Sequence, residues 1–287
     1  MNNSLKIGIV AGLIAGLITG IVAFIQALIE FNLGIPYWAL PPPPETPIIK
    51  IATTEIAINL IWGIIFGIIY SKAYDVIPGK GIRKGLVIGL FYYLVHWIRV
   101  TIFNLPYLEF GYAILNVTMG FTPLVVYGLV LGFLYEFLHS RFHISKKSVK
   151  IKEYSITRGI YLGAIAGFLG GIVAYIFLVI TRAMLDIPVL LDIGWILSQI
   201  GTHTLIHMFW GIVFGAIYAK VYDLVPGKGI TKGFYYGLIY LLITGLIVST
   251  YSLAYGHIAW FIGYAFIDTP ALIAYGLILG ALYKPTK

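Results

Sequence analysis

Two pairs of polar side chains occupy corresponding places in two similar stretches of the sequence. Glu55 and Asn59 are four residues apart, and so are His203 and His207. Residues at this spacing share one face of a helix. Ionisable groups inside apolar helices are costly in hydrocarbon and usually face the interior of a helix bundle. Because histidine titrates near neutral pH, such faces are suited to relaying protons or binding ions.

Other polar groups fall at a similar depth when helices are counted from their outer ends at about 1.5 Å per residue. The count predicts a polar cluster in the outer half of the membrane, reaching the midplane. The members of this predicted cluster are Glu55, Asn59, His96, Arg99, His203, His207, His257 and Asp268.

Three interpretations of the cluster are open. In the first, Glu55 pairs with Arg99, and His207 pairs with Asp268 or Tyr264, as satisfied interior contacts. In the second, the same groups form a pathway for a proton, an ion or a small polar solute.

In the third interpretation the cluster binds a metal ion or haem. His203, His207 and Asp268 are a plausible ligand set for a metal, and His96 opposite one of these histidines could bracket a haem. His-x3-His lacks the glutamate of the zinc-protease motif. No cofactor is therefore the default expectation, with a metal or haem as the alternative.

Signatures of enzymes are missing from the sequence. There is no Gly-x-Ser-x-Gly nucleophile motif and no dinucleotide or kinase signature. The sequence also contains no cysteine, which excludes disulfides, iron–sulfur clusters and thiolate metal sites. These observations favour a protein that is not an enzyme.

The elements that must position the cluster are membrane-spanning helices. Hydrophobic residues make up 60% of the 287 residues and charged residues only 10%, and the mean hydropathy is +0.95, far from the composition of a soluble domain. A span needs about 20 mostly apolar residues. Eight stretches qualify and predict an all-α membrane protein; they run over 7–30, 52–71, 85–105, 110–137, 157–182, 193–219, 233–252 and 258–283. The first is too long for a signal peptide, so we expect it to be kept as a helix.

Basic residues alternate between the segments that connect these spans. Of the 19 Lys and Arg, all but Lys50, Arg99 and Arg182 lie in the terminal segments or in 72–84, 141–158 and 220–232. The positive-inside rule then predicts a multi-pass protein of the cell membrane with both termini cytoplasmic. The net charge of +8 is explained by topology, with anionic lipid headgroups as possible partners besides the bilayer and other membrane subunits. No basic face with interleaved aromatics is left for nucleic acid.

The sequence contains an internal duplication. From Trp62 to Leu90, 19 of 29 residues recur 148 positions later, starting at Trp210. We expect two four-helix repeats, at 1–150 and 151–287. Since each repeat has an even number of crossings, both enter the membrane from the same side, with a pseudo-two-fold axis along the membrane normal.

The lack of Cys and the heavy use of Ile are typical of a thermophile.

Two glycine patterns predict local structure. Glycines at every fourth position, such as Gly8 and Gly12, predict a face for close packing of the first helix of each repeat, with a glycine-lined pore as the alternative. The Tyr-Asp-x-x-Pro-Gly-Lys-Gly motif predicts a tight turn on the cytoplasmic side. Headgroup binding is the alternative role for its lysines, which are Lys80, Lys84, Lys228 and Lys232.

Each half of the chain resembles the small four-helix inner-membrane proteins of the YagU type. The resemblance is carried by the Gly/Ala-rich first helix with its proline-rich segment, Gly12 to Pro44, by His207-Met-Phe-Trp, by His96 with Pro106, and by Gly256-His257-Ile-Ala-Trp260-Phe. No single copy keeps all of these features. The resemblance implies a four-helix fold and interior histidines, and it implies no reaction. The sequence thus predicts movement of a proton, ion or small polar solute, with a redox subunit or a membrane scaffold as alternatives.

Overall fold

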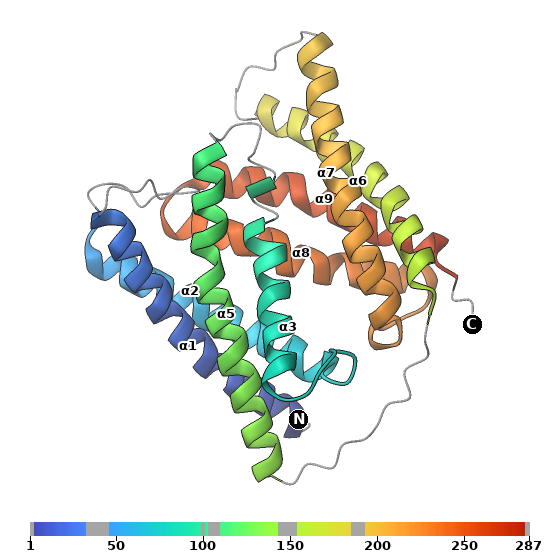
Figure 1. Ribbon diagram of the computed structural model, residues 1–287. Helices are drawn as coiled ribbons and strands as arrows, with labels where there is room; N and C mark the ends of the chain where they lie inside the picture. The colour runs from blue at the N-terminus through green and yellow to red at the C-terminus, as the bar shows by residue number, and fades with distance from the viewer. Residues whose placement is uncertain are drawn as a thin grey trace. The chain divides into compact units, whose positions relative to one another are not determined.

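The elements of the chain are helical throughout the described residues of a computed structural model, which are 3–32, 46–98, 101–102, 110–142, 154–184 and 193–284 (Figure 1). They are α1 (Asn3–Asn32), α2 (Ile48–Ala73), α3 (Ile82–Tyr93), η1 (Leu94–Ile98), α5 (Phe110–Arg141), α6 (Ile156–Met184), α7 (Ile193–Val221), η3 (Tyr222–Leu224), α8 (Gly229–Ala254) and α9 (Ile258–Leu282).

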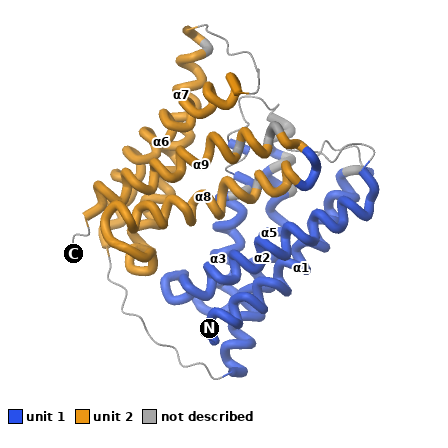
Figure 2. The backbone as a smooth tube through the Cα atoms, turned by 180° about the vertical axis from the view of Figure 1, so that it is seen from behind, with its two compact units in different colours: residues 1–150, 254–256 blue, residues 151–253, 257–287 orange. Residues whose placement is uncertain are grey.

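The chain divides into two compact units, which Figure 2 distinguishes by colour. The first unit comprises residues 1–150 together with 254–256, and the second comprises 151–253 and 257–287. The first unit contains α1, α2, α3, η1 and α5, and the second contains α6 to α9 with η3.

Seven helices in the described part of the chain are long and apolar enough to cross a membrane. The protein is therefore an all-helical, polytopic membrane protein. The spans are Asn3–Glu30, Ile48–Ala73, Gly120–Arg141, Ile156–Met184, Ile196–Leu224, Gly229–Ala254 and Phe261–Leu282.

The span predicted at 85–105 is not among these seven. Its residues form α3, a helix of 12 residues, which continues as the five-residue π-helix η1. Arg99 and Val100, which follow η1, lie outside the described residues. The eighth span stays a prediction.

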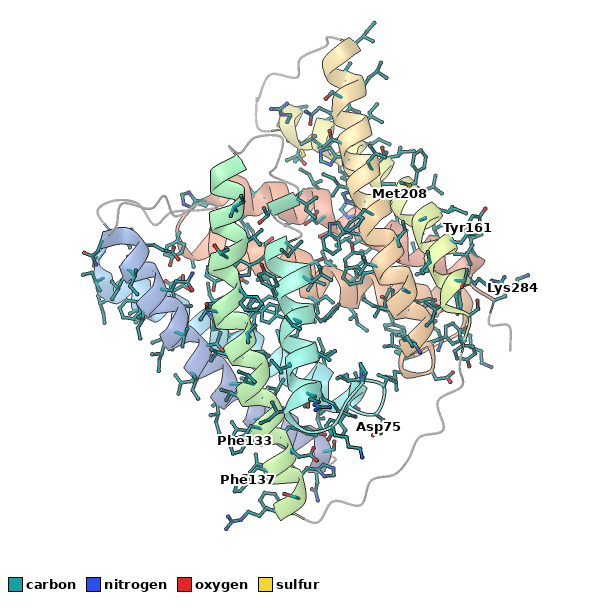
Figure 3. The ribbon with its side chains drawn as sticks, viewed as in Figure 1. Asp75, Phe133, Phe137, Tyr161, Met208 and Lys284 are labelled. Carbon is teal, nitrogen blue, oxygen red and sulfur yellow. The ribbon has the colours of Figure 1, made fainter. Side chains whose placement is uncertain are left out.

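Bulky apolar side chains cover the outside of the long helices. On α1, Val10, Leu17, Ile21 and Ile25 are exposed, whereas Ala11 on the other face is buried. Phe133 and Phe137 of α5 stack on each other and point away from their unit, as Figure 3 shows. This pattern is the reverse of that in a soluble protein, because lipid is as apolar as the interior.

Glycines bring α1 and α2 into direct backbone contact. A Cβ atom added to Gly12 would lie 2.3 Å from the carbonyl oxygen of Gly63, and one added to Gly8 would lie 2.5 Å from that of Gly67. The residue order shows that the two helices are antiparallel. In the second unit, Gly163 of α6 meets Gly211 of α7 in the same way, at 2.1 Å. The predicted close packing of the first helix of each half is confirmed.

The other helices of each unit pack through glycine as well. In the first unit, a Cβ on Gly85 of α3 would lie 2.1 Å from the carbonyl oxygen of Gly128 of α5. In the second, a Cβ on Gly233 of α8 would lie 2.1 Å from that of Gly276 of α9. Each unit therefore consists of two helix pairs whose backbones touch.

Each Pro-Gly-Lys-Gly motif forms a tight turn. Gly79 and Gly81 in the first turn have φ values of +98° and +53°, and Gly227 and Gly229 in the second have +86° and +51°, a region that suits glycine. The predicted tight turn is confirmed, and its cytoplasmic location stays a prediction.

A lysine from the next helix closes each turn. The ammonium group of Lys84 donates to the carbonyl oxygen of Tyr74 and lies 3.9 Å from the centre of its ring. Lys232 does the same with Tyr222, at 4.1 Å from the ring centre. Cations stabilise the carbonyl end of a helix and the face of an aromatic ring. The ammonium groups of Lys84 and Lys232 thus stabilise the turns. The side chain of Lys80, by contrast, is exposed.

Candidate functional site

One face of α2 carries the polar residues of the first unit. Glu55, Asn59, Trp62, Phe66 and Tyr70 follow each other at steps of three or four residues, and all are buried. This spacing keeps them on one side of the helix. Along this face, the ionisable and polar residues Glu55 and Asn59 come first, and the aromatic residues follow.

The carboxyl group of Glu55 lies inside the first unit, where its side chain is 2% exposed. The hydroxyl of Tyr255, a residue of the same unit, donates to Glu55 Oε1 at 3.1 Å. Tyr92 of α3 is close enough for the charge of Glu55 to act on it. The side-chain amide of Asn59 donates to the backbone oxygen of Glu55 at 2.8 Å. Glu55 therefore accepts a hydrogen bond from a tyrosine that is distant in the sequence, and a second tyrosine lies near it.

The corresponding face of α7 carries two histidines. His203, His207, Trp210, Phe214 and Tyr218 repeat the spacing found on α2. The His207 side chain is 6% exposed, and its Nδ1 atom lies 2.9 Å from the backbone oxygen of His203. The two imidazole ring centres are 6.3 Å apart.

Asp268 of α9 faces the same interior. Its side chain is 7% exposed, and its charge acts on His203. A Cβ placed on Gly245 of α8 would lie 3.5 Å from Asp268 Oδ2, so the carboxylate also borders α8. Within the second unit, the structure thus places Asp268 near His203, and His207 lies one helical turn from His203.

The remaining predicted residues are less completely described. Arg99 and the side chain of His96 lie outside the described residues, as does the side chain of Tyr264. The predicted Glu55–Arg99 pair therefore stays a prediction. His257 is the residue that precedes α9, where its backbone N–H donates to the oxygen of Ser252.

A metal site would need several ligand groups close together. In the described ranges, no group of three or more His, Cys, Asp or Glu side chains is arranged to hold a metal ion. His203, His207 and Asp268 therefore gain no geometric support as a ligand set.

Sequence reasoning did not predict the tyrosine clusters that fill each unit. The first tyrosine column consists of Tyr92, Tyr127, Tyr70, Tyr74 and Tyr135. Phe66 stacks on Tyr92 with ring centres 4.0 Å apart, Tyr92 meets Tyr127 at 5.8 Å, and Tyr70 meets Tyr135 at 5.0 Å. The hydroxyl of Tyr127 donates to the backbone oxygen of Gly63 at 2.9 Å.

The end of the first column that contains Tyr74 and Tyr135 is linked to polar groups. The hydroxyl of Tyr74 donates to the carboxylate of Glu136, and the hydroxyls of Tyr135 and Ser4 are 2.7 Å apart. Burial is the main cause that raises the pKa of Tyr74, and its hydrogen bond to Glu136 adds to the effect. Tyr74 therefore stays protonated and keeps donating at neutral pH.

The second tyrosine column consists of Tyr240, Tyr275, Tyr236, Tyr218, Tyr222 and Tyr283. Phe214 stacks on Tyr240 at 3.5 Å, and Tyr240 meets Tyr275 at 5.3 Å. The hydroxyl of Tyr275 donates to the backbone oxygen of Gly211 at 3.0 Å. Most of these contacts repeat those of the first column at positions 148 residues later. The repeated Trp-x3-Phe-x3-Tyr spacing on α2 and α7 was the sequence signal from which part of this cluster could have been predicted.

The chain matches no protein-family model, no curated protein and no solved structure. The function has to be argued from the geometry described above.

Proposed function

We propose that this membrane protein mediates the movement of a proton, an ion or a small polar solute across the bilayer. The observation that carries the proposal is that the buried side chains of His207 and Asp268, with the half-buried His203 beside them, lie inside membrane-spanning helices. Ionisable groups at membrane depth are costly and are typical of ion pathways and proton relays.

A purely structural role explains these residues less well. The paired helices of each unit pack through glycine backbones and aromatic rings, and these contacts involve no ionisable group. Polar contacts between membrane helices contribute only about 0.6 kcal/mol on average. Apolar packing at these positions would therefore stabilise the fold about as well as two histidines and a carboxylate do.

The proposed architecture is a tandem duplication with eight spans and both termini in the cytoplasm. Recurring contacts support the duplication, since Tyr127 donates to Gly63 and Tyr275, 148 residues later, donates to Gly211. The even number of crossings in each repeat keeps both on the same side of the membrane and implies the pseudo-two-fold axis along the normal. The exposed lysines of the turns, such as Lys80, are then available to anionic headgroups of the cell membrane.

The proposal is tested by flux into liposomes. Purified protein is reconstituted, and uptake of protons is followed with an entrapped pH dye while uptake of Na⁺ and K⁺ is followed with ion indicators. His207→Gln removes a titratable group at nearly constant volume. His139→Gln, in the last turn of α5, is the matched control.

We expect flux in the unmodified protein, a strong loss in His207→Gln, and no change in His139→Gln. Absence of flux for every ion tested would count against transport. An absorption band of haem, or about one metal per chain that disappears in a His203→Ala, His207→Ala double variant, would instead identify a redox subunit.

A further inference from the structure

In each unit a tyrosine near the end of the last helix contacts the start of the first helix. In the first unit the hydroxyls of Tyr135 and Ser4 are 2.7 Å apart, and in the second the hydroxyl of Tyr283 donates to the backbone oxygen of Ser155 at 3.4 Å. We call these two contact regions the first corner and the second corner. Because they occupy corresponding places in the two units, the charged residues beside them can be compared directly.

The second corner carries two cations. Arg158 follows Ser155 by three residues, and its guanidinium is close enough for its charge to act on Tyr283. Lys284 follows Tyr283 directly and is exposed. Figure 3 shows the Lys284 side chain pointing away from the helices of its unit. Two positive charges of the same corner are therefore presented to the surroundings.

The first corner has a different charge. The residue three positions after Ser4 is Ile7, which is 6% exposed. The residue that follows Tyr135 is Glu136, whose carboxylate accepts a hydrogen bond from the hydroxyl of Tyr74. Lys6 is exposed at this end of α1, so the first corner combines one cation with one carboxylate. The excess of positive charge is confined to the second corner.

A carboxylate also lies close to the second corner. Asp223 Oδ1 accepts a hydrogen bond from the hydroxyl of Tyr154 at 2.7 Å, and the charge of Asp223 acts on Lys232 of the turn. Because Lys232 supplies a third positive charge beside this carboxylate, Arg158 and Lys284 remain in excess.

Arg158 lies at the end of an apolar surface of α6. Tyr161, Phe168 and Ile176 follow it on the same side of the helix. Their side chains are 65%, 43% and 49% exposed, and Figure 3 shows Tyr161 pointing away from the unit. Tyrosines of this kind are typical of the interface between membrane and water. Along α6 the surface thus changes from a cation, through an interfacial tyrosine, to apolar side chains.

We propose that the second corner binds the phosphate headgroup of an anionic phospholipid. Arg158 and Lys284 contact the phosphate, and an acyl chain lies along Tyr161, Phe168 and Ile176. The order of chemical groups in a phospholipid matches the order of side chains on α6, which favours a lipid over a free phosphate ion. A guanidinium binds phosphate with two parallel hydrogen bonds, and an ammonium group adds a point charge. The site goes beyond the proposed function, because it does not depend on transport.

Lipid binding to the purified protein tests the site. Native mass spectrometry from a neutral detergent gives the dissociation constant of the first bound phosphatidylglycerol, with phosphatidylcholine as the neutral comparison. A Lys or Arg near an anionic membrane surface contributes about fivefold to binding. We therefore expect the dissociation constant for phosphatidylglycerol to rise about fivefold in Arg158→Gln and in Lys284→Gln, and about 25-fold in the double variant.

Matched variants separate this site from general attraction by basic residues. Lys6→Gln removes an exposed lysine at the same end of the first unit and should leave the dissociation constant unchanged. Arg158→Lys keeps the charge and should lose less affinity than Arg158→Gln. Equal melting temperatures of all variants without added lipid verify that the fold is retained.

Three results would overturn the proposal. The first is equal affinity of the unmodified protein for phosphatidylglycerol and phosphatidylcholine. The second is unchanged affinity for phosphatidylglycerol in the double variant, or a loss in Lys6→Gln as large as that in Arg158→Gln. The third is inorganic phosphate that raises the melting temperature as much as phosphatidylglycerol at the same concentration, because the corner would then bind a free anion.

Discussion

Replacement of Gly12 by alanine tests the close packing of α1 against α2. The added Cβ would lie 2.3 Å from the carbonyl oxygen of Gly63 and 2.9 Å from the Cα of Gly67. Both neighbours are backbone atoms and cannot rotate away. The two helices must therefore separate.

The size of the effect follows from these distances. Carbon and oxygen meet at about 3.3 Å across close helix pairs, so the helices must move apart by about 1 Å. Overpacking costs about 1–3 kcal/mol, and the separation also loosens the contacts of Gly8 and Gly67, which places the cost near the upper end. Alanine regains about 1 kcal/mol through its helix propensity. We expect a net loss of about 2 kcal/mol in the free energy of unfolding.

Unfolding by SDS in mixed micelles, followed by circular dichroism, measures this change. Gly201→Ala in α7 is the matched control, because a Cβ there meets no atom of the described residues within 4 Å. The control should be as stable as the unmodified protein or more stable, by up to about 1 kcal/mol.

A Gly12→Ala variant that unfolds at the same SDS fraction as Gly201→Ala would refute the reasoning. It would mean that α1 and α2 do not touch through their backbones. Gly163→Ala, whose Cβ would lie 2.1 Å from the oxygen of Gly211, offers an independent repeat of the test in the second unit.

Three further predictions concern polar contacts. The hydrogen bond to Asp223 raises the pKa of Tyr154 from 10.0 to about 12. Its stabilisation is therefore complete below pH 10 and is lost as the pH rises through 12, so the difference in melting temperature between the unmodified protein and Tyr154→Phe should vanish over that range. Tyr127→Phe and Tyr275→Phe should each lower the free energy of unfolding by about 1 kcal/mol in SDS titrations, since each removes one buried hydrogen bond; an effect in only one of them would contradict their equivalence. Lys232→Met should lower the melting temperature by an amount corresponding to about 1 kcal/mol, because the end of α7 loses its cation, and an unchanged value would show that the ammonium group contributes nothing.

Local patterns in the sequence were sufficient for much of the fold. The glycine faces were predictable because a repeat of four residues fixes one side of a helix, and the turns because only glycine adopts φ values such as +98° at Gly79 easily. The π-helix Leu94–Ile98 inside the span predicted at 85–105 was not predictable, because a uniformly apolar stretch carries no pattern that distinguishes it from an α-helix.

The site was less predictable, because its contacts join distant segments. The hydroxyl that contacts Glu55 belongs to Tyr255, 200 residues away, and no periodicity reveals such a pairing.

The backbone contact between paired helices has a mechanical consequence. Where Gly12 and Gly63 meet, no side chain lies between α1 and α2 that could change its rotamer and let the helices slide. Each glycine-lined pair should behave as a stiff body. Any change of shape within a unit must then take place between one pair and the next, where the helices meet through side chains, such as the stacked rings of Phe66 and Tyr92 and the hydrogen bond from Tyr127 to Gly63.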